Sequence, residues 1–160
     1  MSTLSVDTIQ GQTTAANVKL PAGCVVQTVS ADGPNSQVQF TGTTYTDINL
    51  SATITPKFAT SKILVKFNFV NATATGSNGS YQNITRILRG STQIYEVNRS
   101  PWVNSVMGAS QLMHMEFMDS PSTTSATTYK VQIKNASAGG DVRAHMDNSN
   151  AQVILMEIAQ

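Results

Sequence analysis

The sequence is poor in charge, and this limits what its surface can bind. Lys, Arg, Asp and Glu make up 12% of its 160 residues, about half of the share of roughly 25% that is usual in globular proteins. The formal net charge is +1, and the cationic side chains are scattered along the chain. A nucleic-acid interface needs a concentrated basic patch, and attraction to a membrane surface needs a run of Lys and Arg. The composition therefore predicts no nucleic-acid partner and no insertion into a membrane.

Uncharged polar residues fill the place of the missing charge. Ser, Thr, Asn and Gln together make up more than a third of the chain. A surface of hydroxyl and amide groups forms hydrogen bonds readily with water, backbone or sugar, but without charge it does little to keep identical copies of a protein apart. This composition favours a protein that works within an assembly over a free enzyme.

Cysteine is almost absent, which excludes a disulfide framework within the chain. The one cysteine, Cys24, begins the apolar run Cys24-Val25-Val26. In this context we predict a small buried hydrophobic side chain in a first strand, since no local signature of a catalytic cysteine surrounds it. The stability of the protein must therefore come from its core or from oligomerisation.

The sequence also lacks the motifs that would indicate catalysis or a bound cofactor. No glycine-rich phosphate loop leads from a strand into a helix, and no Gly-x-Ser-x-Gly elbow is present. The candidates for a metal or acid–base cluster are His114, His145, Asp141 and Asp147, and their spacing matches no ligand motif. His145 and Asp147 would share a strand face and form at most a weak site. We predict that the protein is not an enzyme and binds no metal or other cofactor.

Residues 1–23 form a polar leader with isolated apolar residues and no helical stripe. A secretory signal needs a basic start and an apolar run of about 7–15 residues, so we predict no signal peptide. An arm of this kind either docks on a partner or is disordered, and we predict that it docks. The expected anchors are Leu4, Val6, Ile9, Val18 and Leu20, with Pro21 stiffening the chain where it enters the body. The alternative is an arm that packs along its own or a neighbouring subunit.

The rest of the chain, residues 24–160, has the pattern of an all-β domain. Between residues 62 and 70, apolar residues alternate with polar ones, which is the period of a half-buried strand. Segments with strand character recur with turn signals between them: 25–29, 37–40, 43–54, 62–70, 84–88, 92–97, 111–118, 127–134, 142–146 and 153–158. Residues 101–110 fit either a long loop or a poorly formed strand. We predict an antiparallel sandwich or barrel, and among these a jelly-roll-like sandwich preceded by an extended N-terminal arm.

The final segment, residues 153–158, is a nearly continuous apolar run. A strand that is apolar on both faces is buried on both faces. We therefore expect this strand in the centre of a sheet or against another subunit.

The segment 111–118 is rich in methionine. Met113, Met115 and Phe117 share one face of a strand, while Leu112, His114, Glu116 and Met118 share the other. Ordinary core packing explains the methionines. The alternative is a subunit interface along a three-fold axis, formed by Met113, Met115, Met118 and His114. At such an axis His114 would stack or bind an ion, whereas within one subunit it would be hydrogen-bonded.

A carbohydrate site needs an exposed aromatic platform flanked by amides, and Trp102 is the candidate for a ligand contact of this kind. It follows Pro101 and lies close to Asn104 in the sequence. Tyr81 and Tyr95 are weaker candidates. Burial in the core is the default for the one tryptophan of the chain.

The leader also carries a resemblance to a known family. It has the sequence STLSVDTIQG at residues 2–11, TTA at 13–15 and LPAG at 20–23. This resembles the N-terminal attachment segments of tail fibres and other virion proteins of tailed bacteriophages, particularly those of cyanobacteria and other marine bacteria. The body, from residues 61–65 to residues 154–159, resembles the small jelly-roll heads of such proteins. The resemblance implies a virion structural protein at the particle surface, with a homotrimeric head similar in outline to tumour-necrosis-factor-like domains.

Two virion roles agree with this resemblance. A capsid decoration, or cement, protein would bind the shell through its arm and clamp neighbouring capsomers with a trimeric body. A short tail fibre or receptor-binding protein would join the tail through the arm and grip a host surface glycan. Tail fibres usually carry a shaft between attachment segment and head, and no repeat separates the two here, which favours decoration. A further alternative is an oligomeric carbohydrate-binding module outside the virion.

Overall fold

The computed structural model describes residues 20–74, 81–103, 109–136, 141–145 and 149–160. These residues form ten strands, and none of them lies in a helix. The strands are β1 (Val25–Asp32), β2 (Val38–Phe40), β3 (Thr46–Ile54), β4 (Lys62–Ala74), β5 (Tyr81–Arg89), β6 (Thr92–Val103), β7 (Ala109–Asp119), β8 (Thr127–Asn135), β9 (Asp141–Ala144) and β10 (Gln152–Ile158).

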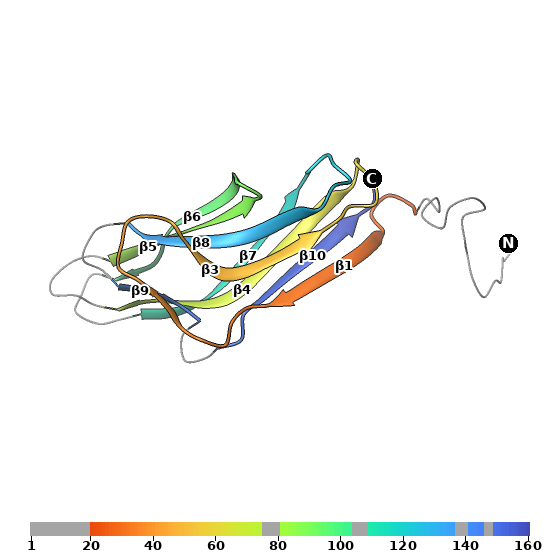
Figure 1. The fold of residues 1–160 in the computed structure, drawn as a ribbon. Helices are drawn as coiled ribbons and strands as arrows, with labels where there is room; N and C mark the ends of the chain where they lie inside the picture. The colour runs from red at the N-terminus through yellow and green to blue at the C-terminus, as the bar shows by residue number, and fades with distance from the viewer. Residues whose placement is uncertain (1–19, 75–80, 104–108, 137–140, 146–148) are drawn as a thin grey trace, which may run out of the picture.

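The strands form two antiparallel sheets that face each other (Figure 1). In the first, which we call sheet I, β1, β10, β4 and β7 lie side by side. The short pair β2 and β9 continues this sheet, since β9 pairs with the far end of β4. In the second, sheet II, the order is β3, β8, β5 and β6.

The pairing of the strands is nested. If β1 with β2 and β9 with β10 are each counted as one interrupted strand, the first pairs with the last (β1 with β10), the second with the seventh (β3 with β8), the third with the sixth (β4 with β7) and the fourth with the fifth (β5 with β6). A chain that is rolled up in this way into two four-stranded sheets is a jelly roll. The prediction of an all-β, antiparallel jelly-roll-like sandwich is confirmed.

The core lies between the sheets and is built from alternate residues of each strand. On β4, Ile63, Val65, Phe67 and Phe69 are fully buried, and the residues between them lie on the outer face of sheet I. The facing strands of sheet II contribute buried side chains such as Tyr129. Each such apolar side chain contributes about 1.5–3 kcal/mol when it is fully buried, so this alternation supplies most of the stability.

The observed strands differ from the predicted ones mainly at their ends. β6 continues through Pro101 to Val103, so the first part of the ambiguous segment is a strand. Proline is acceptable there because β6 is the edge strand of sheet II and an edge strand has one side without a ladder. β9 ends at Ala144 because His145 has a positive φ of 57°, which an extended strand does not allow. β10 lies between β1 and β4, so the prediction of a central C-terminal strand is confirmed.

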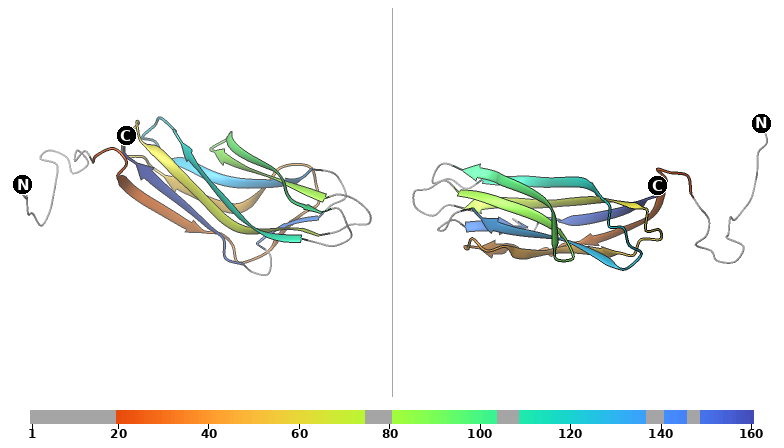
Figure 2. Two further views of the ribbon diagram at one scale, coloured as in Figure 1. Left: turned by 180° about the vertical axis from the view of Figure 1, so that it is seen from behind. Right: turned by 90° about the horizontal axis from the view of Figure 1, so that it is seen from above.

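Both ends of the described chain lie at the same end of the sandwich (Figure 2). Two backbone hydrogen bonds join them, from Gly23 N to Ala159 O and from Ala159 N to Cys24 O, each 2.9 Å long. Cys24 itself is a half-buried free thiol. The body therefore holds the chain in a defined position at Gly23 and Cys24, where the N-terminal arm joins the body.

Buried amides at the opposite end of the sandwich generate a prediction about stability. Asn83 of β5 is fully buried, and its Nδ2 donates to Oδ1 of the equally buried Asn71 at 2.8 Å. Asn83→Ala removes this donor, so we expect it to lower the free energy of unfolding by about 1–3 kcal/mol. Asn98→Ala, at an exposed position of the same hairpin, should change it by less than about 0.5 kcal/mol. Urea denaturation of both variants measures this, and equal effects would contradict the prediction.

Candidate functional site

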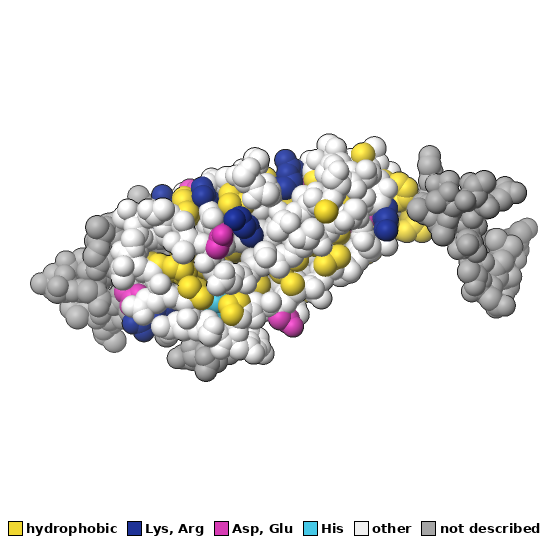
Figure 3. Space-filling view, viewed as in Figure 1, with side chains coloured by type: hydrophobic (Ala, Val, Ile, Leu, Met, Phe, Trp, Pro, Cys, Tyr) yellow, Lys and Arg dark blue, Asp and Glu magenta, His cyan; other side chains and the backbone are white. Residues whose placement is uncertain are grey.

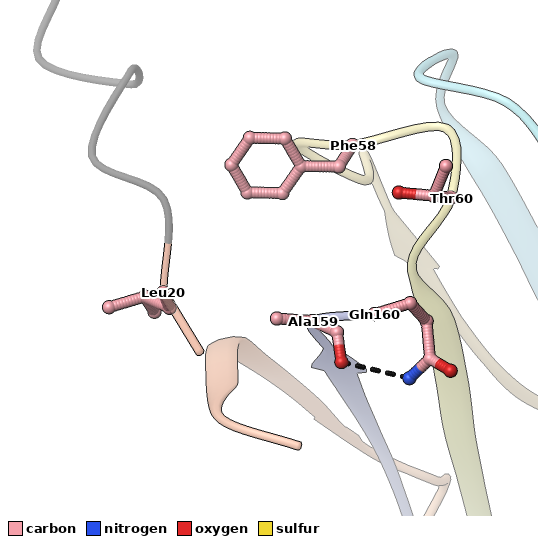
Figure 4. A pocket seen from close by; sticks show the side chains of 5 residues that line it. All are labelled: Leu20, Phe58, Thr60, Ala159 and Gln160. Atoms are coloured by element: carbon pink, nitrogen blue, oxygen red, sulfur yellow. Dashed lines mark hydrogen bonds between the residues drawn. The ribbon is translucent and has the colours of Figure 1, made fainter. Parts of the chain in front are cut away.

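The described part of the N-terminal arm begins at Leu20, which is 39% exposed. Leu20 borders a shallow hollow of about 140 Å³ at the end of the sandwich (Figure 4). The other side chains around it are Phe58, Thr60, Ala159 and Gln160. On the face of the molecule in Figure 3, charged side chains lie singly or in pairs among uncharged polar ones, and apolar side chains gather where the described chain begins.

The local backbone fixes where the arm leaves the body. Gly23 has a φ of +88°, a conformation that residues with a Cβ atom rarely adopt. The turn it forms is closed by a hydrogen bond of 3.1 Å from Cys24 N to Pro21 O. Leu20 and Pro21 are the last two of the six residues predicted to matter for docking, and both are exposed. The other predicted anchors, Leu4, Val6, Ile9 and Val18, lie outside the described residues.

A buried carboxylate lies beneath this end of the molecule. Glu157 of β10 is fully buried. Its oxygens accept hydrogen bonds from the backbone N–H of Lys57 at 2.8 and 3.0 Å, from that of Phe58 at 3.1 Å, and from Gln27 Nε2 at 2.6 Å. Glu157 therefore ties the β3–β4 connection, which carries Phe58, to β1 and β10.

The charged state of Glu157 is favoured. Burial raises the pKa of its carboxyl group, but the hydrogen bonds from Lys57, Gln27 and Phe58 outweigh burial and hold the pKa below its ordinary value of 4.5. Sequence reasoning missed this role, because a single Glu in an apolar run gives no sign that three distant groups converge on it.

The four residues of the predicted subunit interface lie on two different faces of β7. Met113 and Met115 are 5% and 2% exposed and pack in the core between the sheets. Met118 and His114 lie on the outer face of sheet I, and Met118 is 48% exposed. An interface on this strand would therefore involve Met118 and His114 directly, with the other two methionines supporting the strand from inside.

Met118 belongs to an apolar surface on the outer face of sheet I. It lies opposite Leu64 of β4, which in turn lies opposite Met156 of β10. Ile154 and Ile158, on the same face of β10, are half-buried. We call these five residues the outer patch: Leu64, Met118, Ile154, Met156 and Ile158. The apolar run of the last strand is thus explained, since one of its sides faces the core and the other this surface.

Charges at the border of the outer patch neutralise one another. Lys66 Nζ lies 3.1 Å from Glu116 Oε2, and His114 Nε2 lies 3.4 Å from the same oxygen. The hydrogen bond from Lys66 is the main cause that holds the pKa of Glu116 below its ordinary value. The second ring nitrogen of His114 is hydrogen-bonded to Asn68 Oδ1.

The outer face of sheet II is different, because polar side chains cover it and bond to one another. Lys130 contacts Asp47 at 3.1 Å. Arg86 lies 3.7 Å from the centre of the Tyr45 ring, and Tyr45 donates to Glu96 at 2.8 Å. Burial and this hydrogen bond raise the pKa of Tyr45 to about 12. Among the described side chains, the outer patch of sheet I is therefore the apolar surface that is offered to a partner.

The remaining candidates from the sequence do not form a common site. His145 is buried outside a strand, and its Nε2 lies 2.8 Å from Ile48 O; Asp147 lies outside the described residues. Within the described part of the chain, no group of three or more His, Cys, Asp or Glu side chains could hold a metal ion. The backbone of Trp102 pairs with Gln82 in β5–β6, but its side chain is not among those described.

Tyr95, a weaker candidate for a sugar platform, is engaged within the molecule. Its ring stacks on Phe117 with the ring centres 5.1 Å apart and the planes 6° from parallel. This contact joins β6 to β7 at the edge of the sandwich. In the described residues, no helix is long and apolar enough to cross a membrane.

No model of a protein family matches this sequence, and no curated protein matches it. Among solved structures, the chain is similar to the VP2 protein of infectious bursal disease virus in T=1 particles, with 14% identity and a TM-score of 0.42 over 89% of this chain and 40% of that one. It is similar to a chain of the T13 particle of the same virus, with 13% identity and a TM-score of 0.46 over 84% and 36%.

A third similar structure is dimeric latent PorU from Porphyromonas gingivalis, with 10% identity and a TM-score of 0.41 over 88% of this chain and 14% of that one. This chain therefore spans 40% or less of the length of these three proteins. At these TM-scores the assignment of the fold rests on the nested strand order rather than on the similarities.

The hydrogen bonds of Glu157 predict a dependence of stability on pH. Because its pKa is lowered in the folded protein, the stability that it contributes is present above pH 4.5 and is lost as the pH falls through the folded value. We expect Glu157→Gln to lower the free energy of unfolding by about 1–3 kcal/mol at neutral pH. The difference between wild type and variant should shrink as the pH falls from neutral to below 4.5. Denaturation curves across this range measure it, and a difference independent of pH would contradict the assignment.

Proposed function

We propose that this protein is a structural subunit of a virus particle, which assembles with copies of itself and attaches to the particle through its N-terminal arm. The observation that carries the proposal is the position of residues 20–24, which we call the arm base. Backbone hydrogen bonds hold the start of β1 against Ala159, and the exposed Leu20 leads away from the end of the sandwich. The resemblance of the leader to phage attachment segments supports a tailed bacteriophage as the source of the particle. The jelly roll supports a virion role, because it is a frequent architecture of capsid domains.

The arm attaches by main-chain and apolar contacts. An extended segment adds a strand to the exposed edge of a partner sheet, and pockets in the partner take alternate side chains. The anchors are Leu4, Val6, Ile9, Val18 and Leu20, with Pro21 limiting the conformations of the exit. Several arms on one assembly act at high effective concentration, so each of them can be weak.

The body assembles as a homotrimer through the outer patch. Contiguous apolar surface marks interaction sites on soluble proteins, and Met118 is the most exposed residue of this surface. The border pair Lys66 and Glu116 can be covered without leaving an unpaired charge, because each is the other's partner. His114 lies at the same border, and Met113 and Met115 hold β7 in place from the core.

A capsid decoration role is favoured over a tail-fibre role. The described chain passes from Leu20 directly to β1, with no shaft between arm and body. A protein that binds the assembled shell but not its separate parts stabilises the shell by mass action. The second candidate, a short tail fibre or receptor-binding protein with a trimeric head, is favoured by the leader resemblance alone. A carbohydrate-binding module outside the virion is the third.

The copy number per particle tests these roles. Quantitative mass spectrometry against the major capsid protein should find on the order of hundreds of copies in a simple ratio to the shell, as the symmetry of a decorated shell requires. A few to a few tens of copies would instead indicate a tail fibre. Absence from purified particles would contradict a virion role altogether.

Self-assembly through the outer patch has a separate test. Met118→Asp places an unpaired charge where the interface is to form, and we expect it to weaken self-association at least about tenfold, equivalent to 1.4 kcal/mol. Ser51→Asp, an exposed substitution on β3 of sheet II, is the matched control and should leave association unchanged. Sedimentation equilibrium measures both. If the two variants behave alike, the interface lies elsewhere.

A further inference from the structure

A second hollow lies on sheet I, at the end of the sheet farthest from the arm along β1. Its volume is about 430 Å³, within the range of roughly 300–1,000 Å³ that is usual for small-molecule sites. Five polar side chains line it: Asp32, Asn35, Asn68, Asn150 and Gln152. They come from β1, the connection that follows it, β4, the segment just before β10, and the start of β10. We call this hollow the amide pocket.

The chemistry of the amide pocket selects a class of ligand. Among the described residues, its polar side chains are four carboxamides and one carboxylate, and none of the lining residues is Lys, Arg or aromatic. A phosphate or carboxylate ligand would find no cation there, and a flat apolar ligand would find no ring to stack on. Carboxamides both donate and accept hydrogen bonds, while a carboxylate accepts them. A neutral ligand with several hydroxyl groups, each a donor and an acceptor, matches this set.

Hydrogen bonds within the protein fix which atoms face the ligand. Gln152 Nε2 donates to Asp32 Oδ1 at 3.2 Å, which leaves the Gln152 carbonyl oxygen and the second Asp32 oxygen as acceptors. His114 occupies Oδ1 of Asn68, so the Asn68 amide nitrogen remains as a donor. Among the described residues, Asn35 and Asn150 have no side-chain hydrogen bonds, and both are exposed. Asp32, Gln152 and Asn68 thus present two acceptors and one donor in a fixed arrangement, whereas the amides of Asn35 and Asn150 can turn to suit the ligand.

The floor of the amide pocket is rigid. Gly33 N donates to Ala151 O at 2.8 Å. A Cβ atom at Gly33 would lie 2.9 Å from the Ala151 Cβ atom and 3.1 Å from Leu50 Cδ1, so the two segments approach as closely as glycine allows. Such a floor holds the polar groups in place before a ligand arrives, which lowers the entropic cost of binding.

The register of the strands sets the width of the pocket. Asp32 lies opposite Gln152, and Gln152 lies opposite Asn68. Neighbouring strands are about 4.8 Å apart, so these three side chains span about 10 Å. This is the scale of one or two sugar rings.

We propose that the amide pocket binds a neutral glycan by hydrogen bonds to Asp32, Asn35, Asn68, Asn150 and Gln152, without a metal ion. Gln152 lies two residues along β10 from Ile154 of the outer patch, a distance of about 7 Å, and His114 at the border of the patch is hydrogen-bonded to Asn68. The pocket therefore adjoins the outer patch. Several pockets on one assembly raise the avidity of a weak single site. The site is separate from Trp102, the contact predicted from the sequence.

The test uses the full chain, purified in its native state, on immobilised neutral glycans and on sialylated or phosphorylated glycans. We expect binding to at least one neutral glycan, unchanged by EDTA. The double variant Asn35→Ala, Asn150→Ala should reduce the affinity at least about tenfold, because it removes two exposed amides that make no side-chain hydrogen bond to any described residue. Asn98→Ala, an exposed amide on sheet II, is the matched control and should bind as the wild type does.

Several results would overturn the proposal. These are binding to anionic glycans alone, binding that EDTA abolishes, wild-type affinity in the double variant, or no neutral glycan bound at millimolar concentration. Saturation-transfer NMR with the bound sugar gives a second readout, since the signals should disappear in the double variant while its thermal unfolding is unchanged. All of these measurements use isolated protein, so their outcome is independent of whether it belongs to a virus particle.

Discussion

The register of β4 is the constraint on which most of this structure depends. β4 pairs with β7 along one side and with β10 and then β9 along the other, so it joins all parts of sheet I. Its odd-numbered side chains, such as Phe67, fill the core, and its even-numbered ones face outward. A shift of one residue would exchange the two faces, and with them Leu64 of the outer patch and Asn68 of the amide pocket. The core therefore positions the surface sites, because both belong to one strand.

The outer faces of the two sheets differ in chemistry. On the outer face of sheet II, the described polar side chains contact one another, as Arg86 and Tyr45 do. Sheet I combines three features along its strands: the arm base, the outer patch, and the amide pocket. The attachment, self-assembly and glycan binding proposed above would all use sheet I and leave the outer face of sheet II to solvent. The low charge of the chain agrees with this arrangement, because identical subunits with few charges repel one another little.

Much of the fold could be predicted from the sequence, because alternation along a strand is local information. Strand segments such as 62–70 and the two faces of β7 follow from it, and the central position of β10 follows from its nearly continuous apolar run. The strand order required the structure, since it depends on pairs such as Val29 with Leu155 that are far apart in the chain. The sites were harder to predict from the sequence for the same reason. Glu157 and the amide pocket are each built from segments that meet only after folding, and no local pattern marks them.

The arm base also has a mechanical consequence. A pull on Leu20 along the axis of β1 loads that strand against β10, with which it pairs over nearly its whole length. The hydrogen bonds between the two strands lie across the direction of pull, so they are loaded in shear and share the force, instead of opening one after another. Tension on the N-terminal arm is therefore distributed over all the hydrogen bonds between β1 and β10, and through β10 it passes to the rest of sheet I.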